Sequence, residues 1–282
     1  MILLTGGTGT VGRLVARRLS GVAPVRVLTR DPRRVAPGPQ VDAVAGDFGD
    51  PASLERALAG VRSALLVTAD PLAPAHDEHF VTAALRAGVG HVVKLSALAV
   101  TDAGATDLIT AWQRGNERLL RESGLSWTML RPRAFMSNTL SWARSVREEG
   151  VVRAPGGHAP NATVDPRDVA EVAAAALLDP DAHAGRCHAL TGPESVSAAE
   201  QTRVLADLLQ RPLRYEELAP DTARELLRAR YPAPLADALL ESAARGRSGA
   251  KARVRPTVEQ LLGRPARGYR DWAADHLEAF GG

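Results

Sequence analysis

The chain has 282 residues, 45% of them hydrophobic, which is enough for one large α/β domain or two smaller ones with a well-formed core. No apolar run reaches the roughly 18 residues of a membrane span, and the single cysteine, Cys187, excludes an intrachain disulfide and argues against a cysteine-based metal site. The net charge is +3 and the basic residues are spread along the chain, which argues against a nucleic-acid partner.

The first two thirds of the chain alternate short apolar runs with helix-like segments. Strands are expected at 2–5, 25–29, 42–45, 64–68, 91–96 and 127–131, and helices at 10–19, 53–58, 76–87 and 108–123. A strand that begins at Ile2 leaves no room for a signal peptide, so a reducing, cytoplasmic setting is expected. Strands that are apolar on both faces and alternate with helices predict an α/β fold with a parallel sheet covered by helices.

Beyond Pro132 the pattern loosens. Helices are expected at 138–149, 168–178, 198–209, 221–230, 258–262 and 272–280, a strand at 188–190, and a loop rich in Gly and Pro at 154–161. The basic run from Arg245 to Arg253 contains two glycines, and we interpret it as a solvated, mobile loop.

A glycine-rich loop, TGGTGTVG, joins the first expected strand to the first expected helix. Its glycines match the dinucleotide-binding fingerprint GxGxxG and also its short-chain dehydrogenase variant GxxGxxG. Gly9 lets the backbone approach a pyrophosphate, Gly12 lets helix and strand pack closely, and the first-turn N–H groups favour phosphate oxygens. The residues predicted to hold a dinucleotide here are Gly6, Thr8, Gly9, Thr10, Val11 and Gly12.

The second strand ends at Arg30, where a chain that binds NAD usually carries Asp or Glu. A guanidinium suits a ribose 2′-phosphate and cannot replace the carboxylate as a hydrogen-bond acceptor. We therefore predict NADP(H) as the cofactor. A slip of one residue would place Asp31 at this position instead, and that alternative stays open. At least one of Arg33 and Arg34 is expected at a solvated helix end.

Six motifs occur in order along the chain. They are GGTGTVG at 6–12, GDFGDP at 46–51, VVKLS at 92–96, SGLSWTMLRP at 123–132, DPRDVA at 165–170 and LTGP at 190–193. Together they resemble the NmrA-like family of atypical short-chain dehydrogenases/reductases, over nearly the whole chain. The resemblance implies a doubly wound Rossmann core at 1–132, to which 163–182 return, and a smaller substrate-covering region at 133–162 and 183–282.

The resemblance also implies where the cofactor meets the strand ends. Asp47 and Phe48 would lie by the adenine, Thr68 and Ala69 by the ribose and phosphates, and Ser96 near the nicotinamide. For Asp47 a turn-capping role before the next helix is an equal alternative.

The Tyr-x-x-x-Lys pair of classical short-chain dehydrogenases is absent. The resemblance places its positions on Ile109 and Gln113, and the alternative register, on Trp112 and Asn116, also lacks an acid. Three alternatives remain open. In the first, the substrate is a compound such as a quinone, whose reduction needs little acid catalysis. Ser96, Gln113 or Asn116 donates a hydrogen bond to a developing oxyanion. In the third, Lys94 assists the reaction. Lys94 is also one of the predicted cofactor contacts.

Lys94 is unusual because it lies in an apolar strand, two residues before Ser96, so both side chains are expected on one face of the sheet. The alternative is that its ammonium reaches the surface or caps a helix carbonyl.

Four further residues are predicted to contact a flat or aromatic substrate: Trp112, Phe135, Asn138 and Trp142. Ordinary packing, or an N-cap in the case of Asn138, is the alternative for these residues.

The sequence thus predicts an NADP-dependent oxidoreductase. It would transfer hydride from NADPH to a quinone, enone or related carbonyl compound, as a quinone reductase or as a tailoring enzyme in a biosynthetic pathway. Two alternatives are an NADP(H)-sensing regulator that performs no chemistry and an isomerase or cyclase on the same fold. A small-molecule substrate is expected, with no membrane or nucleic-acid partner, and a homodimer is allowed.

Overall fold

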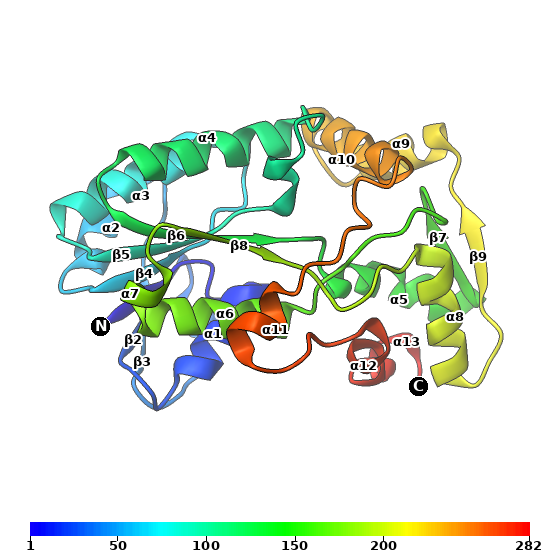
Figure 1. The fold of residues 1–282 in the computed structure, drawn as a ribbon, viewed down its shortest axis with the longest axis horizontal. Helices are drawn as coiled ribbons and strands as arrows, with labels where there is room; N and C mark the ends of the chain where they lie inside the picture. The colour runs from blue at the N-terminus through cyan, green and yellow to red at the C-terminus, as the bar shows by residue number, and fades with distance from the viewer. The chain divides into compact units, whose positions relative to one another are not determined.

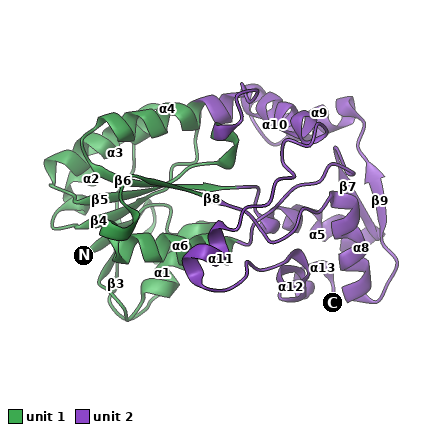
Figure 2. Cartoon of the chain, viewed as in Figure 1, with its two compact units in different colours: residues 1–100, 112–132, 166–189 green, residues 101–111, 133–165, 190–282 purple.

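The computed structural model describes residues 1–282 and divides into two compact units (Figure 2). Unit 1 comprises residues 1–100, 112–132 and 166–189, and unit 2 comprises residues 101–111, 133–165 and 190–282. Each unit has its own cluster of buried apolar side chains. No helix combines the length and apolar character that a bilayer crossing requires.

A seven-stranded sheet forms the centre of unit 1 (Figure 1). Its strands are β1 (Ile2–Leu4), β2 (Val25–Thr29), β3 (Val41–Ala45), β4 (Ser63–Leu66), β5 (His91–Leu95), β6 (Ser126–Pro132) and β8 (Arg186–Leu190). They lie in the order β3-β2-β1-β4-β5-β6-β8, and neighbours from β3 to β6 pair in parallel. The predicted α/β fold is confirmed, and the order is that of a doubly wound dinucleotide-binding sheet.

Helices cover both faces of this sheet. They are α1 (Thr10–Leu19), α2 (Pro51–Leu58), α3 (Ala75–Arg86), α4 (Leu108–Glu122), α6 (Pro166–Leu178) and α7 (Pro180–His183), with short 3-10 helices η1 (Pro32–Arg34) and η2 (Leu98–Thr101). Helices α2, α3 and α4 lie over one face and α1 and α6 over the other (Figure 1). Local chemistry sets several of the ends: Asp50 accepts from two N–H groups of the first turn of α2, and Pro51 occupies its first position.

Unit 2 is mainly helical. It contains η3 (Met136–Trp142), α5 (Ala143–Glu149), β7 (Val151–Ala154), α8 (Ala198–Leu209), β9 (Arg214–Glu217), α9 (Pro220–Arg228), α10 (Ala233–Gly246), α11 (Thr257–Leu262), α12 (Tyr269–Ala274) and α13 (Leu277–Phe280). Strands β7 and β9 form a parallel pair. The core of the unit gathers around the fully buried rings of Tyr269, Trp272 and Phe280.

Several elements of unit 2 differ from the sequence prediction. The helix expected at 138–149 begins as the 3-10 helix η3, and that expected at 272–280 is two short helices. Strands β7 and β9 and helix α10 were not predicted. Each of the two strands has only four residues, and they pair with each other across about 60 residues of sequence. The residues around each strand therefore do not indicate that it will pair.

The prediction of a mobile loop from Arg245 to Arg253 is wrong at its start. Arg245 and Gly246 belong to α10, and the Arg245 side chain is 20% exposed and bonded to Asp102. Its carboxylate partner lies more than a hundred residues earlier, at a distance that a local pattern does not reach.

Candidate active site

The glycine-rich loop runs from β1 into α1, and two of its positions, Gly6 and Gly12, require glycine. Gly6 has a φ of +62°, the left-handed region that favours glycine. A Cβ on Gly12 would lie 2.3 Å from the Gly6 carbonyl oxygen. Gly9 is the N-cap of α1, and no side chain caps the first-turn N–H groups. The loop therefore presents backbone donors and the positive end of the helix dipole to an anion.

A pocket of about 330 Å³ lies beside this loop, at the carboxyl ends of the parallel strands. Arg30 lines it, and its Nε lies 3.9 Å from Asp47 Oδ2. Asp31 does not line it, and its carboxylate accepts a hydrogen bond from the Nε of Arg33 at 2.8 Å. This hydrogen bond from Arg33 lowers the pKa of Asp31. The pocket thus offers an exposed guanidinium at the position predicted for a 2′-phosphate.

Other predicted cofactor contacts line the same pocket, among them Gly6, Thr8, Asp47, Phe48 and Ala69. The Phe48 ring stacks on His76, with ring centroids 5.5 Å apart. Asp47 Oδ1 accepts from the Gly49 N–H at 2.7 Å, so the turn-capping role is present beside the predicted adenine role. Flat rings, a carboxylate and a nearby phosphate cradle fit an adenine nucleotide. The adenine contact of Asp47 stays a prediction.

Lys94 lies at the centre of a buried polar network within unit 1. Its side chain is 0% exposed, and Nζ lies 2.7 Å from Asp77 Oδ1 and 2.7 Å from the hydroxyl oxygen of Thr68. The Thr68 hydroxyl and the Asn116 amide both donate to Asp77 Oδ2. Burial lowers the pKa of Lys94, and the charge of Asp77 opposes that shift.

The alternative that the Lys94 ammonium reaches the surface or a helix carbonyl is wrong. Its acceptors are the side chains of Thr68 and Asp77, with the Trp112 ring 5.6 Å away. The hydroxyl of Thr68 is used inside this network, so a contact of Thr68 with the cofactor would involve its backbone. A catalytic or cofactor role for Lys94 stays a prediction.

A second network holds Ser96. Its hydroxyl is buried and donates to Glu117 Oε1 at 2.7 Å, and Arg131 Nε donates to the same oxygen at 2.8 Å. Burial favours the neutral form of Glu117, but hydrogen bonds from Arg131 and Ser96 outweigh it and lower the pKa of Glu117. With its proton committed to a carboxylate, Ser96 is left as an acceptor toward a ligand.

Of the three predicted oxyanion donors, Gln113 alone has an uncommitted side chain. Asn116 donates to Asp77 and Ser96 donates to Glu117. Gln113 is 6% exposed, and its Oε1 has no hydrogen-bond partner; the same is true of the indole N–H of Trp112. Unpaired buried polar atoms are costly and uncommon, so these two side chains are suited to a ligand.

Unit 2 contains a further pocket of about 330 Å³. Three of the predicted substrate contacts line it: Phe135, Asn138 and Trp142. Asn138 is exposed and caps no helix, whereas Trp142 is partly buried. Burial raises the pKa of Tyr215 and Tyr269, which makes both weaker acids.

The sequence reasoning missed Asp77, Glu117 and Arg131, which anchor the two networks. A signal for Asp77 existed, because a lysine in an apolar strand requires a buried acceptor. That requirement does not say where in the sequence the acceptor lies. Asp77 belongs to helix α3, whereas Lys94 lies in strand β5.

Comparison with known proteins agrees with this geometry. Residues 6–180 match an NAD(P)H-binding family. The (4-alkanoyl-5-oxo-2,5-dihydrofuran-3-yl)methyl phosphate reductase of Streptomyces griseus is 56% identical over 281 residues, 99% of each chain. An NAD(P)H azoreductase of Xenophilus azovorans is 36% identical over 290 residues, 100% of this chain and 99% of that protein. The NADPH complex of an Escherichia coli NADPH-dependent quinone oxidoreductase has a TM-score of 0.86 at 25% identity, covering 99% of this chain and 100% of that one.

The chain therefore belongs to the NAD(P)H-binding family of Rossmann-fold oxidoreductases. The predicted NADP(H) cofactor and NADP-dependent oxidoreductase class are confirmed. The fold implied by the NmrA-like resemblance is confirmed as well, since an NmrA structure matches at a TM-score of 0.80 and 18% identity, covering 98% of this chain and 95% of that one.

Proposed function

We propose that this NADPH-dependent reductase acts on the ring double bond of a phosphorylated butenolide that carries an acyl group. The observation that carries the proposal is the 56% identity, over 99% of both chains, with a reductase named for such a compound. A butenolide of this kind is a cyclic unsaturated carbonyl compound, so it falls within the enone class predicted from the sequence.

The chemistry of this substrate suits a site without a tyrosine acid. In a 4-alkanoyl-5-oxo-2,5-dihydrofuran the alkene is conjugated with both the lactone carbonyl and the alkanoyl carbonyl. A bound NADPH would supply the hydride for the alkene carbon that bears the phosphomethyl group, and the π electrons of the alkene would become an enolate delocalised over the two carbonyls of the substrate. The other alkene carbon then takes a proton from solvent, so one NADPH and one proton are consumed per saturated lactone. A stabilised enolate needs little help from a general acid.

The residues of unit 1 have separate tasks in this proposal. The loop at 5–12 and the first turn of α1 hold the pyrophosphate, and Arg30 binds the 2′-phosphate. Gln113, whose buried Oε1 has no partner in the protein, would donate its side-chain N–H to the enolate oxygen, where a hydrogen bond is stronger than to the neutral carbonyl. The buried networks of Lys94 and Ser96 keep α3 and α4 fixed against the sheet.

In unit 2 the pocket walls include Phe135 and Trp142. Apolar and aromatic walls suit a lactone ring and an alkanoyl chain.

The test is NADPH oxidation by the purified full-length chain, followed by absorbance, with an acyl butenolide phosphate and with benzoquinone as a parallel acceptor. We expect turnover of the butenolide phosphate with a higher kcat/KM than benzoquinone, and formation of the saturated lactone phosphate by mass spectrometry. NADPH that binds tightly but is not oxidised by either acceptor would favour the NADP(H)-sensing alternative.

A further inference from the structure

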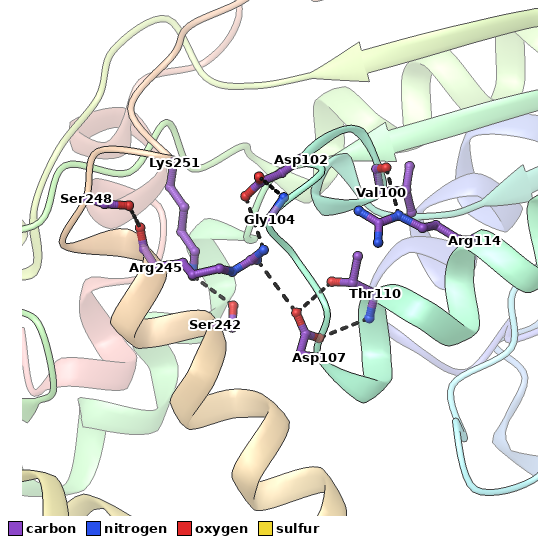
Figure 3. Close-up of polar contacts among 10 residues, drawn as sticks. All are labelled: Val100, Asp102, Gly104, Asp107, Thr110, Arg114, Ser242, Arg245, Ser248 and Lys251. Atoms are coloured by element: carbon purple, nitrogen blue, oxygen red, sulfur yellow. Dashed lines mark hydrogen bonds and ion pairs between the residues drawn. The ribbon is translucent and has the colours of Figure 1, made fainter.

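Unit 2 gathers four basic side chains that the reaction chemistry above does not use: Arg133, Arg245, Lys251 and Arg255. Arg245 Nη1 donates to Asp102 Oδ2 at 3.1 Å, and its Nη2 lies 3.6 Å from Asp107 Oδ2 (Figure 3). Asp107 is held in turn by the backbone N–H and hydroxyl of Thr110. Two carboxylates thus face four cations, which leaves the cluster with a net positive charge of about two at neutral pH.

The guanidinium groups of Arg133 and Arg255 each contain a buried N–H donor without an acceptor. The Nε atoms of Arg133, Arg245 and Arg255 are buried without a hydrogen-bond partner. An unpaired buried N–H costs free energy, more so when it carries charge, and most such groups in proteins are paired.

Mutual repulsion adds to that cost. Burial lowers the pKa of Arg133; the charge of Asp102 opposes that shift, and the charges of Arg245 and Arg255 add to it. Burial, together with Arg133 and Arg245, lowers the pKa of Lys251 to about 8. A cluster of this kind is stabilised by an anion that accepts several hydrogen bonds at once.

Lys251 connects the cluster with the pocket of unit 2. It lines that pocket, and its Nζ donates to the Ser242 hydroxyl at 2.9 Å (Figure 3). Gln201 and Thr163 line the same pocket, are 5% and 7% exposed, and have Nε2 and Oγ1 atoms without hydrogen-bond partners. The pocket therefore combines aromatic walls with unpaired buried polar groups and one wall residue that belongs to the basic cluster.

We propose that this basic cluster binds the phosphate group of the substrate. The inference rests on the proposed function, because it assumes the same phosphorylated substrate. Two oxygens of a phosphate can accept two parallel hydrogen bonds from one guanidinium edge, and Arg133 and Arg255 each have a buried Nε–H without an acceptor. The cofactor phosphates have their own donors in unit 1, so the cluster is not needed for them.

A consequence is selection for the phosphorylated substrate. A hydroxymethyl butenolide would leave the charged N–H groups buried and unpaired, whereas the phosphate satisfies them. Loss of one charge-assisted contact corresponds to about a 10- to 100-fold change in binding.

The experiment compares kcat/KM for an acyl butenolide phosphate with kcat/KM for its hydroxymethyl analogue. We expect the wild-type chain to prefer the phosphate by at least about 100-fold, and Arg133→Gln and Arg255→Gln each to reduce that ratio by about 10- to 100-fold. Arg253→Gln is the matched control, because Arg253 is exposed and outside the cluster. It should leave the ratio unchanged.

The outcomes separate this inference from the proposed function. Turnover of both compounds with equal kcat/KM in the wild-type chain would overturn the phosphate site and leave the reductase function intact. If neither compound is reduced, the proposed function fails, and the site is judged by calorimetry with inorganic phosphate alone. Phosphate that binds to the wild-type chain and more weakly to the Arg133→Gln/Arg255→Gln variant supports the site. No binding to the wild-type chain, or equal binding to both, overturns it. The wild-type measurements can overturn the phosphate site without any variant. A variant that fails to fold therefore does not leave the proposal untested.

Discussion

Replacing Lys94 with Met tests whether this lysine stabilises the fold or takes part in the reaction. The substitution keeps the length of the side chain and removes the ammonium, which lies 2.7 Å from Asp77 Oδ1 with both side chains at most 2% exposed. The Asp77 carboxylate would keep its hydrogen bonds from Thr68 and Asn116 but would lose its counter-charge in the interior.

Breaking a buried ion pair by removing one partner costs about 3–5 kcal/mol, because the remaining charge stays buried without compensation. At about 2–4 °C per kcal/mol for a chain of this size, Lys94→Met should lower Tm by roughly 10 °C. Neutralising both partners in Lys94→Met/Asp77→Asn should cost less than the sum of the two single substitutions. Arg86→Met is a matched control, since the Arg86–Glu55 pair is exposed and should contribute less than about 1 kcal/mol.

The assay is urea and thermal unfolding, with NADPH oxidation measured well below the Tm of each variant. We expect Lys94→Met to retain kcat within about tenfold despite its lower stability. Unfolding of Lys94→Met that matches Arg86→Met would refute the stabilising role of the ion pair. Normal stability together with a loss of kcat of a thousandfold or more would show that Lys94 acts on the substrate or the cofactor.

Three other substitutions and conditions test the remaining parts of the site. Arg30→Asp should raise KM for NADPH by about 10- to 100-fold and change that for NADH little; equal changes in steady-state kinetics would show that Arg30 does not bind the 2′-phosphate. Gly12→Ala places a Cβ 2.3 Å from the Gly6 carbonyl oxygen, so NADPH affinity measured by fluorescence titration should fall at least tenfold; unchanged affinity would contradict the close approach. The pKa of Lys251, lowered by burial to about 8, means that its charge is present below pH 8 and lost above it, so kcat/KM for a phosphorylated substrate should decline as pH rises through about 8. A pH profile with the same decline in Lys251→Met would assign it to another group.

Much of the cofactor site was predictable because its determinants are local. Gly6, Gly9 and Gly12 lie within one turn between a strand and a helix, and the spacing alone carries the requirement for close backbone approach. Arg30 follows its strand directly, so the alternation of strands and helices places it at the same sheet edge as the loop. The alternation of side chains along β5 likewise predicts that Lys94 and Ser96 face the same side, and both bond to helices on that side.

What the sequence determined by itself was therefore the parallel sheet, the NADP(H)-binding loop and the absence of a Tyr-x-x-x-Lys pair. The tertiary structure decided which side chains are already paired. It commits Ser96 to Glu117 and Asn116 to Asp77, leaves Gln113 free, and converts part of an apparent surface loop into a basic cluster around Arg245. These outcomes depend on partners 20 to more than 140 residues apart in the chain, and the chemistry of a polar side chain is fixed by the partner it meets in three dimensions.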